Sequence, residues 1–300
     1  MGDWVVTLAG TPQGAQLATG LALLSALAHA VFGALQKGRH DPWLTRGAID
    51  SWLVVISAPV ALFLVPWPDF TTAMMLAGAF VIHFAYKIAM AVAYTQAAYT
   101  VVYPVVRGTG PLITVVAAYL FFEESFSSLQ WAGVACLSGG ILLLALRNLR
   151  EEIIDPTALR RGLIWAFAGG VLVAIYTVWD AIGIRSAPNP FTFLAWFFFI
   201  TALDFPVIAA WRYRRMQAVP KLMPLMWRGL AGALIAWVSF GGVMLATRLD
   251  SVGEAAVLRE TSTVFAALIG WFILGEKVGP RRLILMALVA FGAVIVEMGG

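Results

Sequence analysis

The chain has 300 residues, of which 61% are hydrophobic and only 12% are charged, and its formal net charge is +4. Apolar runs recur along the whole length, which excludes a soluble protein built around one core and indicates an all-α integral membrane protein. The single cysteine, Cys136, excludes an intrachain disulfide. Because the positive charge gathers in a few connecting segments, we expect no nucleic acid partner.

The apolar runs predict ten membrane-spanning helices. A spanning helix needs about 20 mostly apolar residues. The connectors after the first, fifth, seventh and ninth spans hold 14 of the 20 basic residues. Under the positive-inside rule these connectors are cytoplasmic and both termini are periplasmic, in a bacterial inner membrane. The predicted spans lie at roughly 15–37, 44–66, 71–96, 98–122, 128–147, 162–184, 190–212, 224–248, 252–275 and 281–298.

The first and third spans carry polar residues. For His29 in the first span, close helix packing is the simpler interpretation. In the third span, His83, Lys87 and Tyr94 share one helical face, with Tyr86 alongside. A lysine at the bilayer centre costs about 2.5–3.5 kcal/mol on insertion scales. We therefore expect Lys87 to face protein or water and not lipid.

The fourth span follows the third after almost no connector. We predict a tight antiparallel hairpin between the two spans, turning near Ala97. Lys87 and Arg107 lie ten residues before and after that turn. At about 1.5 Å per residue, both are expected roughly 15 Å from the cytoplasmic surface and level with each other.

The fourth span combines a polar face with helix-breaking residues. Tyr99, Tyr103 and Arg107 share one face. Pro104, Gly108, Gly110 and Pro111 follow one another within eight residues. They are expected to break the helix at midplane. Transporters bind their substrates at such discontinuous helices.

A polar link near residue 150 divides the chain into two halves, 1–150 and 151–300, of five predicted spans each. The seventh span is rich in phenylalanine, for which packing between helices or against lipid is the simpler interpretation. The spans of the second half contain Tyr176, Trp179 and Asp180 in the sixth, Asp204 in the seventh, Trp237 and Phe240 in the eighth, and Glu254, Arg259 and Glu260 in the ninth.

The halves show weak internal similarity at an offset of 152 residues. Arg107 falls on Arg259, Glu124 on Glu276, and Gly140 on Gly292. Since each half has an odd number of spans, the copies are predicted to cross the membrane in opposite directions, as an inverted repeat. The prolines of the first copy are absent from the second, so the second copy need not break at the same place.

Two five-span halves with the pattern of Glu124, Gln130, Gly133 and Gly140 resemble the EamA-domain members of the drug/metabolite transporter superfamily. The resemblance covers essentially the whole chain and, within the family, is greatest to aromatic amino acid exporters. It implies a basket of ten helices whose central cavity is lined by spans one, three, four, six, eight and nine.

The residues that would line such a cavity suggest a binding site for a substrate that carries both a carboxylate group and an aromatic side chain. No carboxylate partner is evident near Lys87 or Arg107, so either cation could receive a substrate carboxylate. Alternatively, Arg107 ties carbonyls exposed at the predicted break, and Lys87 snorkels. The predicted substrate-binding set is His83, Tyr86, Lys87, Tyr99, Tyr103, Arg107, Trp179, Trp237, Phe240 and Arg259.

These features predict a secondary transporter that exports aromatic and other neutral amino acids by alternating access. An exchanger of organic anions or phosphorylated metabolites is the alternative, and a membrane binding protein without transport is a remote one. No catalytic, nucleotide-binding or metal-binding motif is evident, so we expect neither an enzyme nor a cofactor nor a metal. The expected partners are an amino acid and the lipid bilayer, with the chain as a monomer. His83, Asp180 and Glu260 are candidates for proton exchange, and facilitated diffusion is equally consistent.

Overall fold

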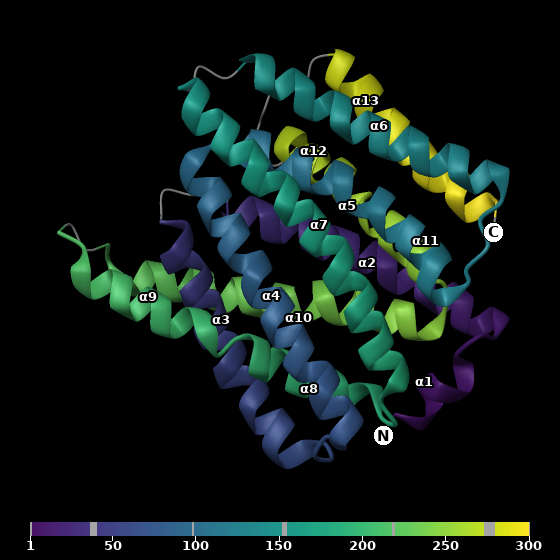
Figure 1. The fold of residues 1–300 in the computed structure, drawn as a ribbon, viewed down its shortest axis with the longest axis horizontal. Helices are drawn as coiled ribbons and strands as arrows, with labels where there is room; N and C mark the ends of the chain where they lie inside the picture. Colours follow the sequence, from purple (N-terminus) through teal and green to yellow (C-terminus); the bar gives the residue numbers. More distant parts are fainter. Residues whose placement is uncertain are drawn as a thin grey trace.

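The structure is a computed structural model that describes residues 2–36, 41–97, 99–151, 155–217, 220–272 and 280–299. Every regular element in these ranges is a helix (Figure 1). Glu276, which the internal similarity pairs with Glu124, lies outside the described residues, as do the basic Lys37, Arg39 and Lys277.

The first half contains α1 to α6. Several helices begin where an acidic residue caps exposed backbone N–H groups. Asp41 accepts hydrogen bonds from Trp43 N and Leu44 N, and Asp69 accepts one from Thr72 N. Hydrogen bonds from Thr72 hold the pKa of Asp69 below its ordinary value. The helices are α1 Asp3–Leu8, α2 Pro12–Gln36, α3 Pro42–Pro59 continued by the π-helix η1 Val60–Leu64, α4 Phe70–Gln96, α5 Tyr99–Phe122 and α6 Ser128–Glu151.

The second half contains α7 to α13. Asp155 and Asn189 each cap a helix whose first residue is proline, a residue that lacks the N–H left unbonded at that position. The predicted interruption at Asp204 is confirmed, because one helix ends at Thr201 and the next begins at Asp204. The helices are α7 Pro156–Ser186, α8 Pro190–Thr201, α9 Asp204–Arg215, α10 Leu222–Leu249, α11 Val252–Arg259, α12 Ser262–Phe272 and α13 Pro280–Met298.

Seven helical segments among the described residues are long and apolar enough to cross a membrane. Ser128–Leu144 and Leu283–Met298 are shorter apolar helices. Large apolar side chains such as Phe63, Val207 and Phe291 are exposed on the outside of the fold, as a lipid environment requires. A multi-pass membrane protein follows from these features. The spanning segments are Pro12–Gly33, Pro42–Leu64, Phe70–Gln96, Val101–Phe122, Pro156–Ser186, Pro190–Arg215 and Leu222–Leu249.

Helix α7 lies between α4 and α5 and packs extensively along both (Figure 1). The predicted turn at Ala97 is confirmed, but the tight packing of the third span on the fourth is wrong. Both helices instead approach α7 closely, through glycines such as Gly162 and Gly170. A Cβ on Gly162 would lie 2.7 Å from the Cβ of Ala97, and one on Gly170 would lie 1.9 Å from Thr109 Oγ1. Small residues on α7 therefore allow α4 and α5 to pack closely against α7, and the two helices pack little against each other.

The predicted break in the fourth span is also wrong, since α5 is a continuous helix through Pro104 and Pro111. Its glycines serve close packing, because a Cβ on Gly108 would lie 2.8 Å from Leu142 and one on Gly110 would lie 3.1 Å from Val173. Threonine hydroxyls in the same stretch donate to backbone carbonyls, as Thr109 Oγ1 does to Val105 O at 2.9 Å. Such donors help a membrane helix to tolerate proline.

Two further pairs of helices pack along each other. Helices α2 and α10 pack along each other, as do α6 and α13 (Figure 1). In the second pair, Gly133 allows α13 to approach closely, since a Cβ there would lie 2.7 Å from Gly292 O. Phe193, Phe197 and Phe198 of α8 are buried in the main apolar core. Their role in helix packing confirms the simpler interpretation of this phenylalanine-rich span.

Candidate functional site

A discontinuous helix does exist, at the junction between α11 and α12. Helix α11 ends at Arg259 and α12 begins at Ser262, so Glu260 and Thr261 lie in the break. The hydroxyl of Thr261 donates to Leu258 O at 2.7 Å, and that of Thr263 donates to Glu260 O at 2.9 Å. These local hydrogen bonds compete with the helical pattern and explain a break without proline or glycine.

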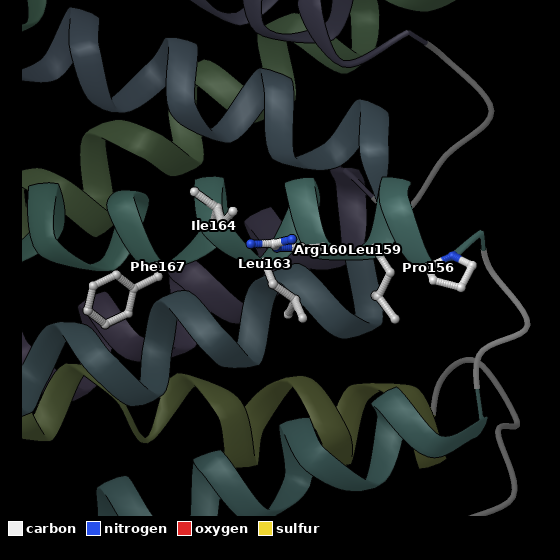
Figure 2. Close-up of a pocket in the computed structure, with 6 residues that line it drawn as sticks. All are labelled: Pro156, Leu159, Arg160, Leu163, Ile164 and Phe167. Carbon is white, nitrogen blue, oxygen red and sulfur yellow. The ribbon is translucent and has the colours of Figure 1, made fainter.

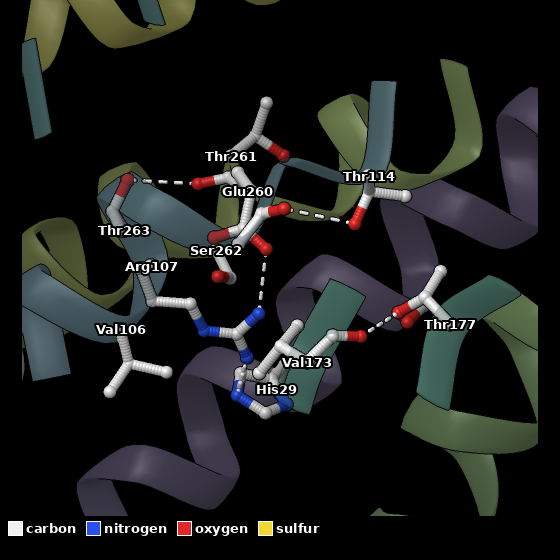
Figure 3. Close-up of polar contacts among 12 residues, drawn as sticks. His29, Val106, Arg107, Thr114, Val173, Thr177, Glu260, Thr261, Ser262 and Thr263 are labelled. Atoms are coloured by element: carbon white, nitrogen blue, oxygen red, sulfur yellow. Dashed lines mark hydrogen bonds and ion pairs between the residues drawn. The ribbon is translucent and has the colours of Figure 1, made fainter. Parts of the chain in front are cut away.

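Arg107 of α5 points toward this break (Figure 3). Its Nη1 donates to Glu260 Oε1 at 2.6 Å, and its Nη2 contacts His29 Nε2 of α2. His29 Nδ1 in turn lies 3.3 Å from Ser239 Oγ of α10. The expectation that Arg107 lacks a carboxylate partner is therefore wrong. The sequence predicted no helix break at Glu260. The contact between Glu260 and Arg107 therefore follows only from the folded structure.

Arg259 is buried without such a partner. Only 3% of its surface is exposed, and its Nε and Nη2 atoms have no hydrogen-bond partner. Its guanidinium carbon lies 4.6 Å from the centre of the Phe240 ring, which is a favourable cation–π contact. Glu260 Oε2 is also buried and without a partner. This region therefore retains unused donors and an unused acceptor.

A second buried pair joins α4 to α7 beside the same ring. His83 Nε2 lies 2.8 Å from Asp180 Oδ2, whereas Asp180 Oδ1 is buried without a partner. The His83 ring stacks on Tyr176 at 4.5 Å and meets Phe197 edge-on at 4.9 Å. The centre of the Phe240 ring lies 6.3 Å from the ring centres of both His83 and Tyr176. Phe240 thus lies near both the His83 pair and Arg259.

Lys87 belongs to a different charged network. Its Nζ donates to Asp50 Oδ2 at 3.0 Å and to Thr201 O at 2.6 Å, and it also contacts Asp204 Oδ1. Arg46 Nη2, one helical turn before Asp50 in α3, lies 2.9 Å from Asp50 Oδ1. The expectation that Lys87 lacks a carboxylate partner is wrong as well. This network connects α4 to α3 and to the junction between α8 and α9.

Two of the predicted tryptophans contact residues away from Arg259. Trp179 Nε1 donates to Met75 O at 2.8 Å, which fixes α7 against α4. Trp237 Nε1 donates to Ser57 Oγ at 3.1 Å, and its ring lies 4.2 Å from that of Phe198.

The predicted tyrosines lie closer to the charged residues. Tyr103 Oη lies 3.4 Å from Ser262 Oγ, and its ring lies 5.4 Å from the guanidinium of Arg107. Tyr86 meets Tyr176 edge-on at 5.2 Å. The side chain of Tyr99 lies outside the described part of the chain.

The structure therefore brings together part of the predicted set. Arg107 and Arg259 lie at the junction of α11 and α12, with Phe240 against Arg259 and His83 near Phe240. The charged partners of Lys87 are instead Asp50 and Asp204. Residues outside the predicted set complete this region, namely His29, Tyr176, Asp180, Ser239 and Glu260. The signal that could have found most of them is polarity within an apolar span, because such residues are costly in a bilayer and are usually functional.

A groove of about 450 Å³ follows one face of α7 (Figure 2). None of its lining residues belongs to the charged clusters, and all of them except the arginine are apolar. A groove of this kind suits the side of a helix that faces lipid. It is lined by Pro156, Leu159, Arg160, Leu163, Ile164 and Phe167.

Residues 160–298 match the EamA-like transporter family. This match covers most of the second half of the chain and supports its resemblance to the drug/metabolite transporter superfamily. The EamA-like segment, residues 160–298, contains most of α7 and all of α8 to α13. Asp180, Phe240, Arg259 and Glu260 lie within it, whereas Arg107 reaches the site from outside the matched segment.

Comparison with solved structures supports the fold. Twenty-nine chains match, and one of them is described only as the crystal structure of a protein. That structure aligns with a TM-score of 0.71 at 19% identity over 96% of this chain and 98% of its own length. At such low identity the likeness concerns the fold alone. No curated protein matches the sequence.

Proposed function

We propose that this EamA-like protein is a secondary transporter that exports aromatic and other neutral amino acids, with Arg259 as the residue that receives the substrate carboxylate. The observation that carries the proposal is the burial of Arg259 with unpartnered Nε and Nη2 atoms. A guanidinium presents its donors in a planar fork that matches a carboxylate. A bound carboxylate would satisfy donors that are costly to leave buried and unpaired.

The choice of Arg259 over the other buried cations follows from their partners. Arg107 is already bound to Glu260, and Lys87 is bound to Asp50 and Asp204. Receiving a carboxylate at either cation would first require an existing ion pair to break. Phe240 lies directly against Arg259 and offers a face for an aromatic substrate ring. Stacked aromatic pairs contribute about 0.5–1.5 kcal/mol beyond burial.

The proposed architecture is ten spans arranged as two inverted halves, 1–150 and 151–300, around a central cavity. It is supported by the offset of 152 residues that relates Arg107 to Arg259, and by the match to a transporter family. Alternating access would proceed by movement of the halves around this site. Charge in the connectors favours a bacterial inner membrane, with both termini periplasmic.

The test is counterflow of radiolabelled phenylalanine in proteoliposomes, with and without a pH gradient. Wild-type protein should exchange phenylalanine, and Arg259→Gln should lose at least roughly tenfold of the rate because a charge-assisted hydrogen bond to the carboxylate is lost. Arg160→Gln, in the groove on α7, is the matched control and should transport normally. A dependence of flux on the pH gradient would identify proton exchange, and its absence would identify facilitated diffusion.

Competition in the same assay decides between substrate classes. Unlabelled tyrosine should compete with labelled phenylalanine, and a sugar phosphate should not. Competition by the sugar phosphate alone would favour the organic-anion exchanger. Absence of any solute flux in correctly inserted wild-type protein would overturn the proposed transport function in favour of a binding protein.

A further inference from the structure

The region around Phe240 holds an unused acceptor as well as unused donors. Asp180 is 3% exposed, and its Oδ1 atom has no hydrogen-bond partner although Oδ2 is bound to His83. A buried carboxylate oxygen in this state is costly. The Arg259 guanidinium lies 4.6 Å from the centre of the Phe240 ring, and the centre of that ring lies 6.3 Å from that of His83, the partner of Asp180.

The surroundings of Asp180 suit a cation. His83 holds the carboxylate, and His83 itself is packed between the ring of Tyr176 at 4.5 Å and that of Phe197 at 4.9 Å. Phe240 lies near this aromatic group and also contacts Arg259. Aromatic faces attract ammonium groups, and a carboxylate oxygen among them provides the charged hydrogen bond.

We propose that Asp180 receives the ammonium group of the substrate, with His83 as its positioning residue, while Arg259 receives the carboxylate. This inference rests on the proposed amino acid transport and names the feature that selects a zwitterion. The two recognition groups carry one positive and one negative charge, which a zwitterion neutralises. An organic anion without an ammonium group would leave Asp180 Oδ1 without a partner, and a phosphorylated metabolite would also bring its second negative charge near that carboxylate.

The placement of charge explains why an acid is needed here. Glu260 shares its Oε1 with Arg107 and has its unpartnered Oε2 at the junction of α11 and α12, whereas the unpartnered Oδ1 of Asp180 belongs to the pair with His83, whose ring is packed among aromatic rings. Sites built to hydrogen-bond a polar substrate group reject analogues that lack it strongly, because the protein group is then left buried and unpaired. Asp180 is therefore expected to contribute more to the preference for substrates with an ammonium group than to the overall affinity for substrate.

The experiment compares phenylalanine with 3-phenylpropionate, which has the same ring and carboxylate but no ammonium group. Both compete with labelled phenylalanine for full-length protein in proteoliposomes. Wild-type protein should prefer phenylalanine by roughly a hundredfold or more. Asp180→Asn should reduce this preference at least roughly tenfold, by weakening phenylalanine and not 3-phenylpropionate. Arg259→Gln should weaken both compounds together.

Controls separate the outcomes. Asp69→Asn, at the exposed start of α4, removes an aspartate outside the site and should retain the wild-type preference. Equal competition by both compounds in wild-type protein would overturn the assignment of Asp180, even if Asp180→Asn failed to fold. An unchanged preference in folded Asp180→Asn would also overturn it, with amino acid transport intact. Failure of wild-type protein to recognise phenylalanine at all would overturn the proposed function itself.

Discussion

Lys87 and Arg259 are both cations buried within apolar helices, but their surroundings differ. Lys87 contacts two aspartates and a backbone carbonyl from three other elements of the fold. Arg259 has an aromatic face on one side and two N–H groups without partners. The first arrangement is complete within the protein and connects helices. The second leaves hydrogen-bond donors unsatisfied, which is why we propose it as the binding site.

The largest expected effect is on the network around Lys87. Replacing Asp50 by alanine removes one of the two carboxylate partners of buried Lys87, and also the partner of Arg46, whose side chain is 27% exposed. Removing one member of a buried ion pair destabilises proteins by about 3–5 kcal/mol. We expect Asp50→Ala to lower the melting temperature of the detergent-solubilised protein strongly. If it melts like the wild type, Lys87 is not held by this network and regains its candidacy as a carboxylate receptor.

A smaller effect is expected for Trp237, whose contacts are with Ser57 and Phe198. Replacing it by phenylalanine removes the hydrogen bond to Ser57 Oγ but retains an aromatic ring against Phe198. The loss of one such bond costs about 1 kcal/mol. The half-saturation concentration for phenylalanine transport should stay unchanged in Trp237→Phe. A clear increase at unchanged stability would place Trp237 in the substrate site.

The smallest effect on stability is expected at Arg259 itself. Replacing Arg259 by methionine removes a cation–π contact of about 1–2 kcal/mol, but also removes the cost of burying an incompletely paired charge. These two effects on stability oppose each other. We therefore expect the free energy of unfolding to change by less than about 1 kcal/mol in Arg259→Met, while transport is lost. If the melting temperature fell as far in Arg259→Met as in Asp50→Ala, the role of Arg259 would be to stabilise the fold.

Much of the architecture could be predicted from apolar runs and local signals. The segments of the spanning helices follow from hydropathy, because a helix satisfies its own backbone in lipid. The interruption at Asp204 and the turn near Ala97 also follow from local sequence. The break in α5 was predicted wrongly, because proline and glycine in a membrane helix equally serve close packing, as Gly108 and Gly110 do against α6 and α7.

The candidate site could be predicted only in part. Lys87, Arg107 and Arg259 stand out in the sequence because lipid excludes charge. Their partners come from positions far along the chain, such as Glu260 for Arg107 and both Asp50 and Asp204 for Lys87. No spacing rule connects residues on helices that meet only after packing.

The sequence by itself determined a helical membrane protein with three buried cations, because hydropathy and the cost of charge in lipid act at each position locally. The tertiary structure decided which of those cations remains available. Packing of α5, α7 and the broken α11 pairs Arg107 with Glu260, and the approach of α3 and α9 to α4 pairs Lys87 with two aspartates. Arg259 keeps unused donors because its helix ends there, beside Phe240. Electrostatic pairing depends on distances between elements, and only the folded chain sets those distances.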